Sequence, residues 1–380
     1  MLPEIRITNL YQSQDEGVSR IGANVEDIPV WFDSEDVRLQ PAPEGFAGIF
    51  LIPAMAQGTN LFIEAPLSPH WRTNASKLMS IFEKWWGYPP VAIREMEGES
   101  NWGAQRAETA LCFTGGVDSF YCLLRGQHPI DYLVFAHGYD IPLGDTDRMK
   151  LFEPSLRAIS DETGTRPVVI RTNLREDPTF RSIPWSRSHG AALAALGHFM
   201  GNAARLIIAA SYPYEFNRPW GSHWEIDPLW SSEVLEVVHS GAGKWRSDKL
   251  QMIADEPLVR RHLRVCWENR DVNLNCCQCE KCLRTMLILE ECGKLDDFKS
   301  FPETSKIPAF LDNLPYLSSD LTVVYQTFLD KGLNPDIEKA LRSLLWRSRN
   351  KWMTNVWQYI WRYLVSLRKR IKSLLRRRPV

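Results

Sequence analysis

Short apolar runs separated by turn residues dominate the pattern of the middle of the chain. Four such runs predict strands, at Ala110–Phe113, Tyr132–Ala136, Val168–Arg171 and Leu206–Ala210. Apolar residues with helical spacing predict helices at Thr146–Thr163 and His189–Met200. Strands that alternate with helices predict an α/β domain over residues 106–295, built on one doubly wound parallel sheet with right-handed crossovers.

The flanking regions have different patterns. Residues 1–105 predict a separate α+β accessory domain, with strands at Glu4–Leu10, Val30–Phe32 and Gly48–Pro53 and a helix at Lys77–Trp86. Residues 296–340 predict a helical segment, and residues 341–380 predict a basic amphipathic helical tail. The chain has no internal repeat.

The expected strand ends are where a ligand would bind, because ligands of such sheets lie beyond the carboxyl ends of the strands. These ends are Thr114–Ser119, His137–Asp140, Thr172–Asn173 and Ser211–Tyr214.

The first of these ends has the strongest chemical signal. It reads Thr114-Gly115-Gly116-Val117-Asp118-Ser119. Two glycines let backbone N–H groups approach a phosphate, and a helix that starts at Asp118 favours an anion at its N-terminus. The hydroxyls of Thr114 and Ser119 can donate to phosphate oxygens, and Asp118 can hold Mg²⁺. The run lacks the lysine of a Walker loop, and no Gly-x-Gly-x-x-Gly follows a strand.

A cysteine cluster follows downstream. Cys276, Cys279 and Cys282 form C-x₂-C-x₂-C, and Cys266 precedes them by ten positions. Four thiolates at this spacing predict a metal site, of which tetrahedral Zn²⁺ is the first candidate, although Cys277 competes with Cys276 as a ligand. We expect Cys112, Cys122 and Cys292 to belong to the core.

Composition and charge change this picture in two ways. The chain has 380 residues and a net charge of −1, but the 12 charged residues from Leu341 onward are all basic. The remainder therefore has 33 of the 45 basic residues against all 46 acidic ones, which disfavours general nucleic-acid binding by the body. The start lacks a signal-peptide pattern and no apolar run approaches the ~20 residues of a membrane span, so we expect a cytoplasmic protein.

The glycine run resembles the Ser-Gly-Gly-x-Asp-Ser signature of PP-loop ATP pyrophosphatases, with Thr114 in place of the first serine. This resemblance implies an adenine nucleotide α-hydrolase-like fold and an enzyme that uses Mg²⁺ and cleaves ATP between its α and β phosphates. Such enzymes adenylate an oxygen of the substrate, and a nucleophile then displaces AMP.

Together with Cys266…Cys276-Cys277-Gln278-Cys279-Glu280-Lys281-Cys282-Leu283-Arg284, the loop resembles the 7-cyano-7-deazaguanine synthases over about 190 residues. Weaker matches are Asp227-Pro228-Leu229 and Ser247-Asp248-Lys249, where the family has Pro-Leu and a lysine near the phosphates. The resemblance implies that ATP activates a deazapurine carboxylate for attack by ammonia, with a structural zinc. The chain departs from the family at Cys277, where a glycine is usual, and in the family's Asp-Tyr-Ser-Gly-Tyr-Pro-Asp segment. These departures predict a divergent relative with a different acceptor.

Further contacts to ATP are expected from Phe113, His137, Asp140 and Lys249. Contacts to a small-molecule substrate are expected from Tyr212, Arg218, Trp220 and His223, because aromatic faces stack on heterocycles and arginine pairs with carboxylates. Without a cysteine at position 2 to serve a built-in amidohydrolase, ammonia would come from solution or from a protein partner.

Several alternatives stay open. The cysteines could carry sulfur or an iron–sulfur cluster in an RNA-modifying PP-loop enzyme, or the chain could be the nucleotide-binding component of a multi-protein assembly. The tail has Trp357 and Trp361 one helical turn apart, and it could contact an anionic membrane, RNA or the chain itself.

Overall fold

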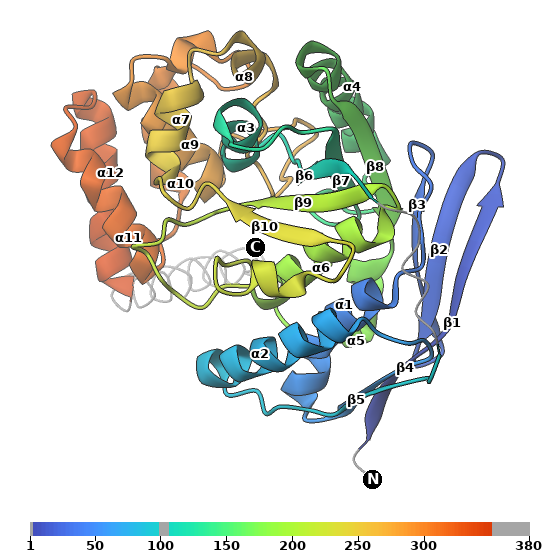
Figure 1. Ribbon diagram of the computed structural model, residues 1–380. Helices are drawn as coiled ribbons and strands as arrows, with labels where there is room; N and C mark the ends of the chain where they lie inside the picture. Colours follow the sequence, from blue (N-terminus) through green and yellow to red (C-terminus); the bar gives the residue numbers. More distant parts are fainter. Residues whose placement is uncertain (1–2, 99–105, 352–380) are drawn as a thin grey trace, which may run out of the picture. The chain divides into compact units, whose positions relative to one another are not determined.

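A computed structural model describes residues 3–98 and 106–351 (Figure 1). Contacts between Cα atoms divide the chain into two compact units, Met1–Leu274 and Asn275–Val380. The tail prediction falls outside the described residues from residue 352 onward. None of the described helices has the length and apolar content that crossing a bilayer requires.

The first unit is α/β and is built on one mostly parallel sheet of ten described strands (Figure 1). The strands are β1 (Glu4–Asp15), β2 (Val18–Val25), β3 (Ile28–Ser34), β4 (Asn60–Ile63), β5 (Ile93–Glu95), β6 (Glu108–Cys112), β7 (Tyr132–His137), β8 (Arg166–Thr172), β9 (Ala203–Ala209) and β10 (Glu236–Ser240). Their order is β10-β9-β6-β7-β8-β3-β2-β1-β4-β5. Strands β6 to β10 are mutually parallel, as are β1, β4 and β5. The pairs β1–β2, β2–β3 and β3–β8 are antiparallel.

The expected boundary near residue 105 does not separate two compact units. Strand β3 pairs with β8 through Phe32 and Thr172, which joins the N-terminal strands to the strands that follow residue 106. The Ser34 hydroxyl also donates to the carbonyl of Val169 at 2.8 Å. A pairing between residues 140 positions apart has no local signal in the sequence, so the single sheet was missed.

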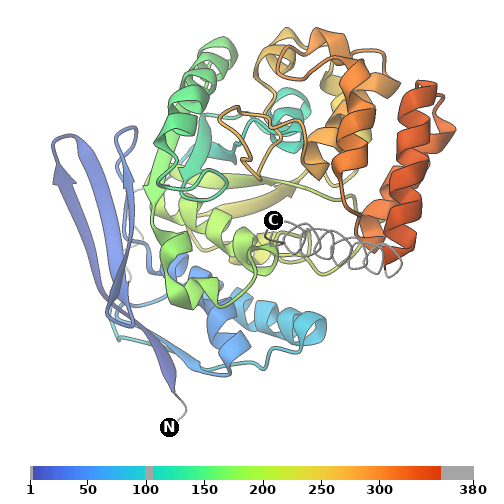
Figure 2. The same cartoon turned by 180° about the vertical axis from the view of Figure 1, so that it is seen from behind.

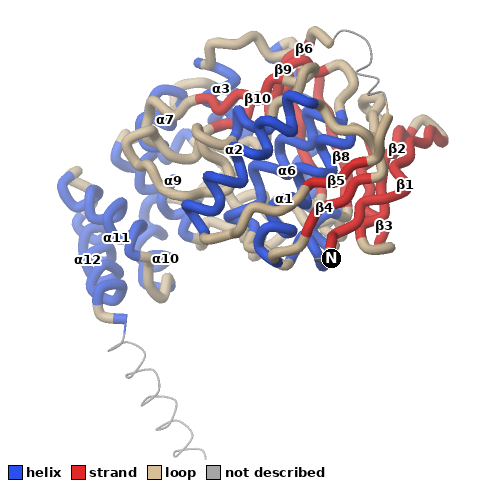
Figure 3. Tube along the Cα trace, turned by 60° about the horizontal axis from the view of Figure 1, so that its bottom comes forward, coloured by secondary structure: helices blue, strands red, loops and turns tan. Residues whose placement is uncertain are grey.

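Helices flank this sheet on both sides. They are α1 (Pro43–Gln57), α2 (Pro69–Trp86), α3 (Val117–Arg125), α4 (Thr146–Thr163), α5 (Pro178–Arg181), α6 (Trp185–Phe199), α7 (Arg246–Ile253) and α8 (Pro257–His262). The short 3₁₀ turns are η1 (Leu174–Glu176) and η2 (Asp227–Trp230). Figure 1 shows α3 and α4 on one side of strands β6 to β9 and α6 on the other, and Figure 2 shows the same arrangement from behind. Helices α1, α2 and α6 lie together over one face of the sheet (Figure 3).

Most expected elements are confirmed, and one is wrong. The four strands after residue 106 are β6 to β9, and the helix expected at Thr146–Thr163 is α4 with those bounds. Gly48–Pro53 is not a strand but the middle of α1, whose residues from Glu44 to Met55 are all buried. A helix buried on every side has no polar face, so its apolar run lacks the helical period. Strands β2, β4, β5 and β10 were not predicted.

One apolar core joins strands from β1 to β10 to helices α1, α2 and α6. Phe32, Phe46 and Phe199 meet in it with ring centroids 4.7–6.1 Å apart, and they join β3, α1 and α6. Each phenylalanine buried in this way contributes about 1.5–3 kcal/mol to folding. The core therefore fixes α6 and the strand ends beside it, where the candidate functional residues lie.

The second unit is helical in its described part. It contains α9 (Glu280–Glu291), α10 (Ile307–Asn313), α11 (Ser319–Gln326) and α12 (Pro335–Arg349), with 3₁₀ turns η3 (Leu295–Asp297), η4 (Thr304–Lys306) and η5 (Thr327–Asp330). The expected boundary at 340 falls inside α12, and Leu341 and Leu344 on that helix are fully buried. The unit starts at residue 275 and not at residue 296, because α9 packs on α10.

Candidate functional site

The glycine loop lies at the point where the strand order reverses. Taken in chain order, β6, β7 and β8 extend the sheet in one direction, and β9 and β10 extend it from the other side of β6. Such a reversal leaves a crevice at the carboxyl end of the central strand, and ligands of open α/β sheets bind there. Residues 113–116 follow the carboxyl end of β6 directly and lead into α3.

The backbone of this loop explains its two glycines. Gly115 has φ +73°, a left-handed conformation that favours glycine, and its carbonyl accepts a hydrogen bond of 2.8 Å from the N–H of Arg264. Gly116 is the N-cap of α3 and provides no side-chain cap. A Cβ at Gly116 would lie 3.4 Å from the Thr114 hydroxyl and 3.7 Å from the carbonyl oxygen of Arg264, distances that the fold tolerates. The loop thus presents backbone amides of a helix start, an arrangement that suits a phosphate.

Two expected loop contacts are constrained by this packing. The Ser119 hydroxyl is buried and donates to the carbonyl of Gly116 at 3.0 Å. The side chain of Phe113 is fully buried and packs edge-on against Phe120 at 5.0 Å between ring centroids. Any contact of Phe113 with a nucleotide would therefore come from its backbone.

Asp118 is held by two cations from α7. Its Oδ2 accepts a hydrogen bond of 2.7 Å from Nη1 of Arg246, and its Oδ1 accepts one of 3.1 Å from Nζ of Lys249. Lys249 is fully buried and also donates to the carbonyl of Ala210, at 2.6 Å. Together the three side chains sum to one positive charge beside the loop, which favours a phosphate there.

The expected role of Lys249 near the loop agrees with this placement, whereas Arg246 was missed. Arg246 and Lys249 are three positions apart on α7, so their side chains share one face of the helix. That spacing is a signal that sequence reasoning could have used.

His137 and Asp140 at the end of β7 belong to a tightly built turn. Nε2 of His137 is hydrogen-bonded to the carbonyl of Pro142 at 3.0 Å, and burial lowers the pKa of this histidine. Gly138 has φ +118°, and a Cβ there would overlap the carbonyl oxygen of Thr172 at 2.1 Å. The carbonyl of Asp140 accepts a hydrogen bond of 2.8 Å from Asn269. Contacts of His137 and Asp140 with ATP stay a prediction.

Seven aromatic rings follow one another past the carboxyl ends of β7 and β9 to the start of α7. They are Tyr139, Trp185, His189, Trp220, Tyr212, Phe216 and Trp245, and we call them the aromatic arc. Successive ring centroids lie 5.2–5.9 Å apart. Trp245 directly precedes Arg246, so the arc ends beside a residue that binds Asp118.

Two arginines lie over the rings of the arc. The guanidinium of Arg218 is 5.1 Å from the ring centroid of Trp220 and 5.6 Å from that of Tyr212. The guanidinium of Arg175 is 4.8 Å from Trp185 and donates to the carbonyl of Tyr139 at 2.7 Å. Flat rings beside a cation suit a planar, anionic molecule. Of the expected substrate residues, Tyr212, Arg218 and Trp220 are brought together here.

His223 has a different environment. Its Nε2 is hydrogen-bonded to Oδ1 of Asn217 at 3.0 Å, and its Nδ1 accepts the N–H of Glu225 at 3.1 Å. Its ring packs on Trp85 and Trp224, which do not belong to the aromatic arc. These contacts hold His223 within its own loop, and its contact with a substrate stays a prediction.

A buried carboxylate, Asp227, lies next to this loop and was not among the expected site residues. Asp227 is fully buried, and its Oδ2 is 2.7 Å from the Ser222 hydroxyl and 2.7 Å from Nδ1 of His239. Its Oδ1 accepts the N–H of His223 at 3.2 Å. No sequence signal predicts the pair with His239, because the two residues lie twelve positions apart and His239 belongs to β10.

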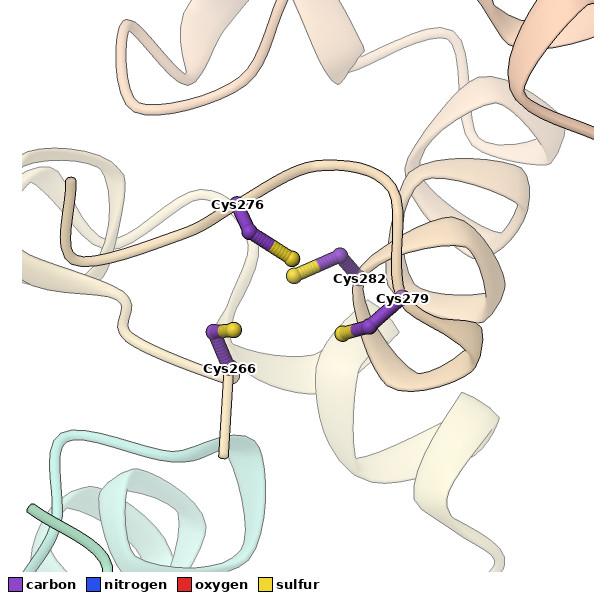
Figure 4. Close-up of side chains that lie close together, drawn as sticks. All are labelled: Cys266, Cys276, Cys279 and Cys282. Atoms are coloured by element: carbon purple, nitrogen blue, oxygen red, sulfur yellow. The ribbon is translucent and has the colours of Figure 1, made fainter. Parts of the chain in front are cut away.

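The four expected metal ligands lie together (Figure 4). The sulfur atoms of Cys266, Cys276, Cys279 and Cys282 are all within 4.8 Å of one another, and all four residues are buried. Tetrahedral zinc with Zn–S bonds of about 2.3 Å separates its sulfurs by about 3.8 Å, so a small contraction would close the site. The donor set fits a metal such as zinc.

Cys277 points elsewhere. Its Sγ lies 3.4 Å from the carbonyl oxygen of Asn275 and 3.6 Å from that of Ser300. Its backbone has φ +57°, the left-handed conformation that glycine adopts most easily. This conformation accounts for the glycine that the resembling family has here. Cys112 and Cys122 are buried as expected, while Cys292 is half-buried at the end of α9.

No protein-family model, curated protein or solved structure matches the chain.

Proposed function

We propose that the protein is an ATP-dependent enzyme of the PP-loop type. In this proposal it adenylates a carboxylate on a planar heterocycle, and ammonia or an amine then displaces AMP. The observation that carries the proposal is the glycine loop at the strand-order reversal, with Asp118 held between Arg246 and Lys249. We also infer that β6 to β10 act as a doubly wound nucleotide-binding sheet.

The loop residues would share the work on the triphosphate. Backbone amides at Gly116 and the start of α3 would bind phosphate oxygens, and Thr114 could donate its hydroxyl. Arg246 and Lys249 would supply the positive charge that leaving pyrophosphate needs. Asp118 is the residue that would hold the Mg²⁺ of Mg·ATP, since a carboxylate cannot usefully approach phosphate without a cation.

The substrate class is inferred from the aromatic arc. Stacking on Trp220 and Tyr212 would orient a flat ring, and Arg218 would attract its carboxylate. A deazapurine carboxylate fits these requirements and agrees with the resemblance in the sequence. The acceptor stays open, because the loop at Ser211–Trp224 differs from that of the resembling family.

The four-cysteine cluster supports a structural metal in this proposal. All four thiols are buried, so a tetrahedral ion there would have no open position for substrate. This burial argues against sulfur transfer from the cluster to RNA. Elemental analysis should find zinc, and iron with acid-labile sulfide would favour the RNA-modifying alternative.

Product analysis tests the proposal. The purified protein is incubated with Mg·ATP, ammonia and a set of heteroaromatic carboxylates that includes 7-carboxy-7-deazaguanine. Formation of AMP and pyrophosphate that depends on the carboxylate is expected. Formation of ADP and phosphate would show that the PP-loop assignment is wrong.

A further inference from the structure

The pair formed by Asp227 and His239 is not used by the chemistry described above. Asp227 is fully buried, and the side chain of His239 is only 4% exposed. A buried carboxylate is costly unless hydrogen bonds compensate it, and this one accepts them from Ser222, His223 and His239. Such a fully satisfied carboxylate can hold an imidazole in one orientation.

The hydrogen bond also fixes the tautomer of His239. An ionised carboxylate can only accept hydrogen bonds, so Nδ1 of His239 must carry the proton that it shares with Asp227 at 2.7 Å. Neutral His239 then has its lone pair on Nε2. This is the arrangement by which a carboxylate prepares a histidine to act as a general base.

Hydrogen bonds link the pair to the phosphate loop. His239 lies opposite Ile208 of β9, and the next residue, Ser240, accepts the N–H of Ala210 at 2.8 Å. The carbonyl of Ala210 in turn accepts Nζ of Lys249, which binds Asp118. His239 is thus near the carboxyl end of β10, at the edge of the sheet that carries the phosphate loop.

The pair is equally linked to the loop that contributes to the aromatic arc. Ser222 and His223, which Asp227 holds, follow Trp220 closely in sequence. The carbonyl of the intervening Gly221 accepts the N–H of Gly190 at 3.0 Å, on the helix that carries His189. One carboxylate therefore fixes both His239 and the loop of Tyr212, Arg218 and Trp220.

Among the titratable groups around His239, Asp227 is the main charged neighbour. Burial lowers the pKa of His189, and it lowers the pKa of His223, so both are neutral near pH 7. Burial raises the pKa of the Cys112 thiol far above its usual range, and this thiol also senses the charge of Asp227. Asp140 acts on His189 from the end of β7.

We propose that His239 is the base that takes a proton from the attacking amine, and that Asp227 is its positioning residue. This inference rests on the proposed function and deepens it. The amine nitrogen attacks the carbonyl carbon of the acyl adenylate, and a C–N bond forms. The N–H proton passes to Nε2 of His239, and the C–O bond to AMP breaks with its electron pair remaining on AMP. The imidazolium then releases the proton to water.

The test separates the two half-reactions. His239→Asn is the variant, since its amide nitrogen can keep the hydrogen bond to Asp227, and His70→Asn on the exposed start of α2 is the control. Adenylation is followed by carboxylate-dependent exchange of pyrophosphate into ATP, with the carboxylates named above. Amine attack is followed by amide formation with ammonia and with hydroxylamine, which is largely unprotonated at neutral pH.

We expect His239→Asn to keep pyrophosphate exchange and to lose amide formation with ammonia by about a hundredfold or more. Hydroxylamine should restore much of that loss, because it needs less help from a base. Asp227→Asn should show the same split between half-reactions with a smaller loss.

Two results would overturn the assignment. One is ammonia-dependent amide formation by His239→Asn within about threefold of wild type. The other is an equal loss of exchange and amide formation, which would make the pair structural; binding of an ATP analogue and the melting temperature show whether the variant is folded. If wild type itself gives no exchange with any carboxylate, the proposed function fails and this inference fails with it.

Discussion

The two halves of the ten-stranded sheet share one core but differ in what their strand ends carry. Strands β1 to β3 are joined by tight turns, as at Glu26–Asp27, where both residues have positive φ. Strands β6 to β10 are parallel, so each must be followed by a longer connection, and these connections start at the same edge. The glycine loop, the turn after His137 and the loop that follows β9 all lie at that edge.

The charged residues differ in the same way. In the N-terminal half, Arg72–Glu95 and Arg6–Glu4 are ion pairs with largely exposed arginines, which contribute little to stability. At the glycine loop, Lys249 is fully buried against Asp118. Burial of a lysine costs more than such a pair returns in stability, so its presence indicates function. Strand direction therefore decides where a shared core can support chemistry.

The largest effect is expected from Asp118→Asn, which tests the half of the sheet formed by β6 to β10. Removing this charge should lower carboxylate-dependent AMP formation by about 10³-fold, since charge stabilisation in a closed site is the largest catalytic contribution. The rate of AMP release measures it. Asp147→Asn on α4, where the carboxylate is exposed and pairs with Lys150, is the matched control and should leave the rate unchanged.

Leu61→Ala tests the N-terminal half of the sheet. Leu61 is fully buried on β4, and the truncation should lower the free energy of unfolding by about 2–5 kcal/mol, as other core leucines do. Urea denaturation measures this change, with Ile28→Ala at a partly exposed position of β3 as the mild control. Below its unfolding transition, Leu61→Ala should bind ATP like wild type. A loss of ATP affinity in the folded variant would show that the N-terminal half also affects the glycine loop.

Acid should lower the free energy of unfolding through the shared core and leave the glycine loop unchanged. Burial lowers the pKa of His198 to about 4, while its Nε2 is hydrogen-bonded to the carbonyl of Trp230. Between the ordinary pKa of 6.5 and about 4, the unfolded chain binds a proton here that the folded chain does not. Stability is therefore lost as pH falls through this window, by up to about 3 kcal/mol. His198→Gln, compared with wild type by denaturation at several pH values, should remove that part of the pH dependence, and an identical profile would contradict it.

The smallest effect is expected from Arg72→Ala. Its ion pair with Glu95 is exposed, so the free energy of unfolding should change by less than about 1 kcal/mol. ATP binding should not change. A larger loss would show that the exposed ion pairs of the N-terminal half contribute substantially to the free energy of unfolding.

Sequence reasoning predicted the parts of the site that are contiguous. Thr114–Ser119 could be read directly because five chemically suited residues lie within six positions at a strand end. The regular spacing of Cys276, Cys279 and Cys282 was equally visible in the sequence. Arg246, His239 and most of the aromatic arc were missed because tertiary packing brings them together from distant positions. The N-terminal boundary was wrong for the same reason, since the pairing of β3 with β8 leaves no local trace.

The central claim is that a triphosphate binds on the loop after β6. Calorimetric titration with Mg²⁺ and α,β-methylene ATP tests it without knowledge of the acceptor. Gly116→Ala adds one methyl group that the fold tolerates but that would occupy the phosphate cradle, and Gly98→Ala is the control, with its nearest neighbour 3.6 Å away. We expect wild type and Gly98→Ala to bind the analogue alike, and Gly116→Ala to bind it at least about tenfold more weakly. Equal binding by all three proteins, or no binding by wild type, would show that the loop after β6 is not a triphosphate site.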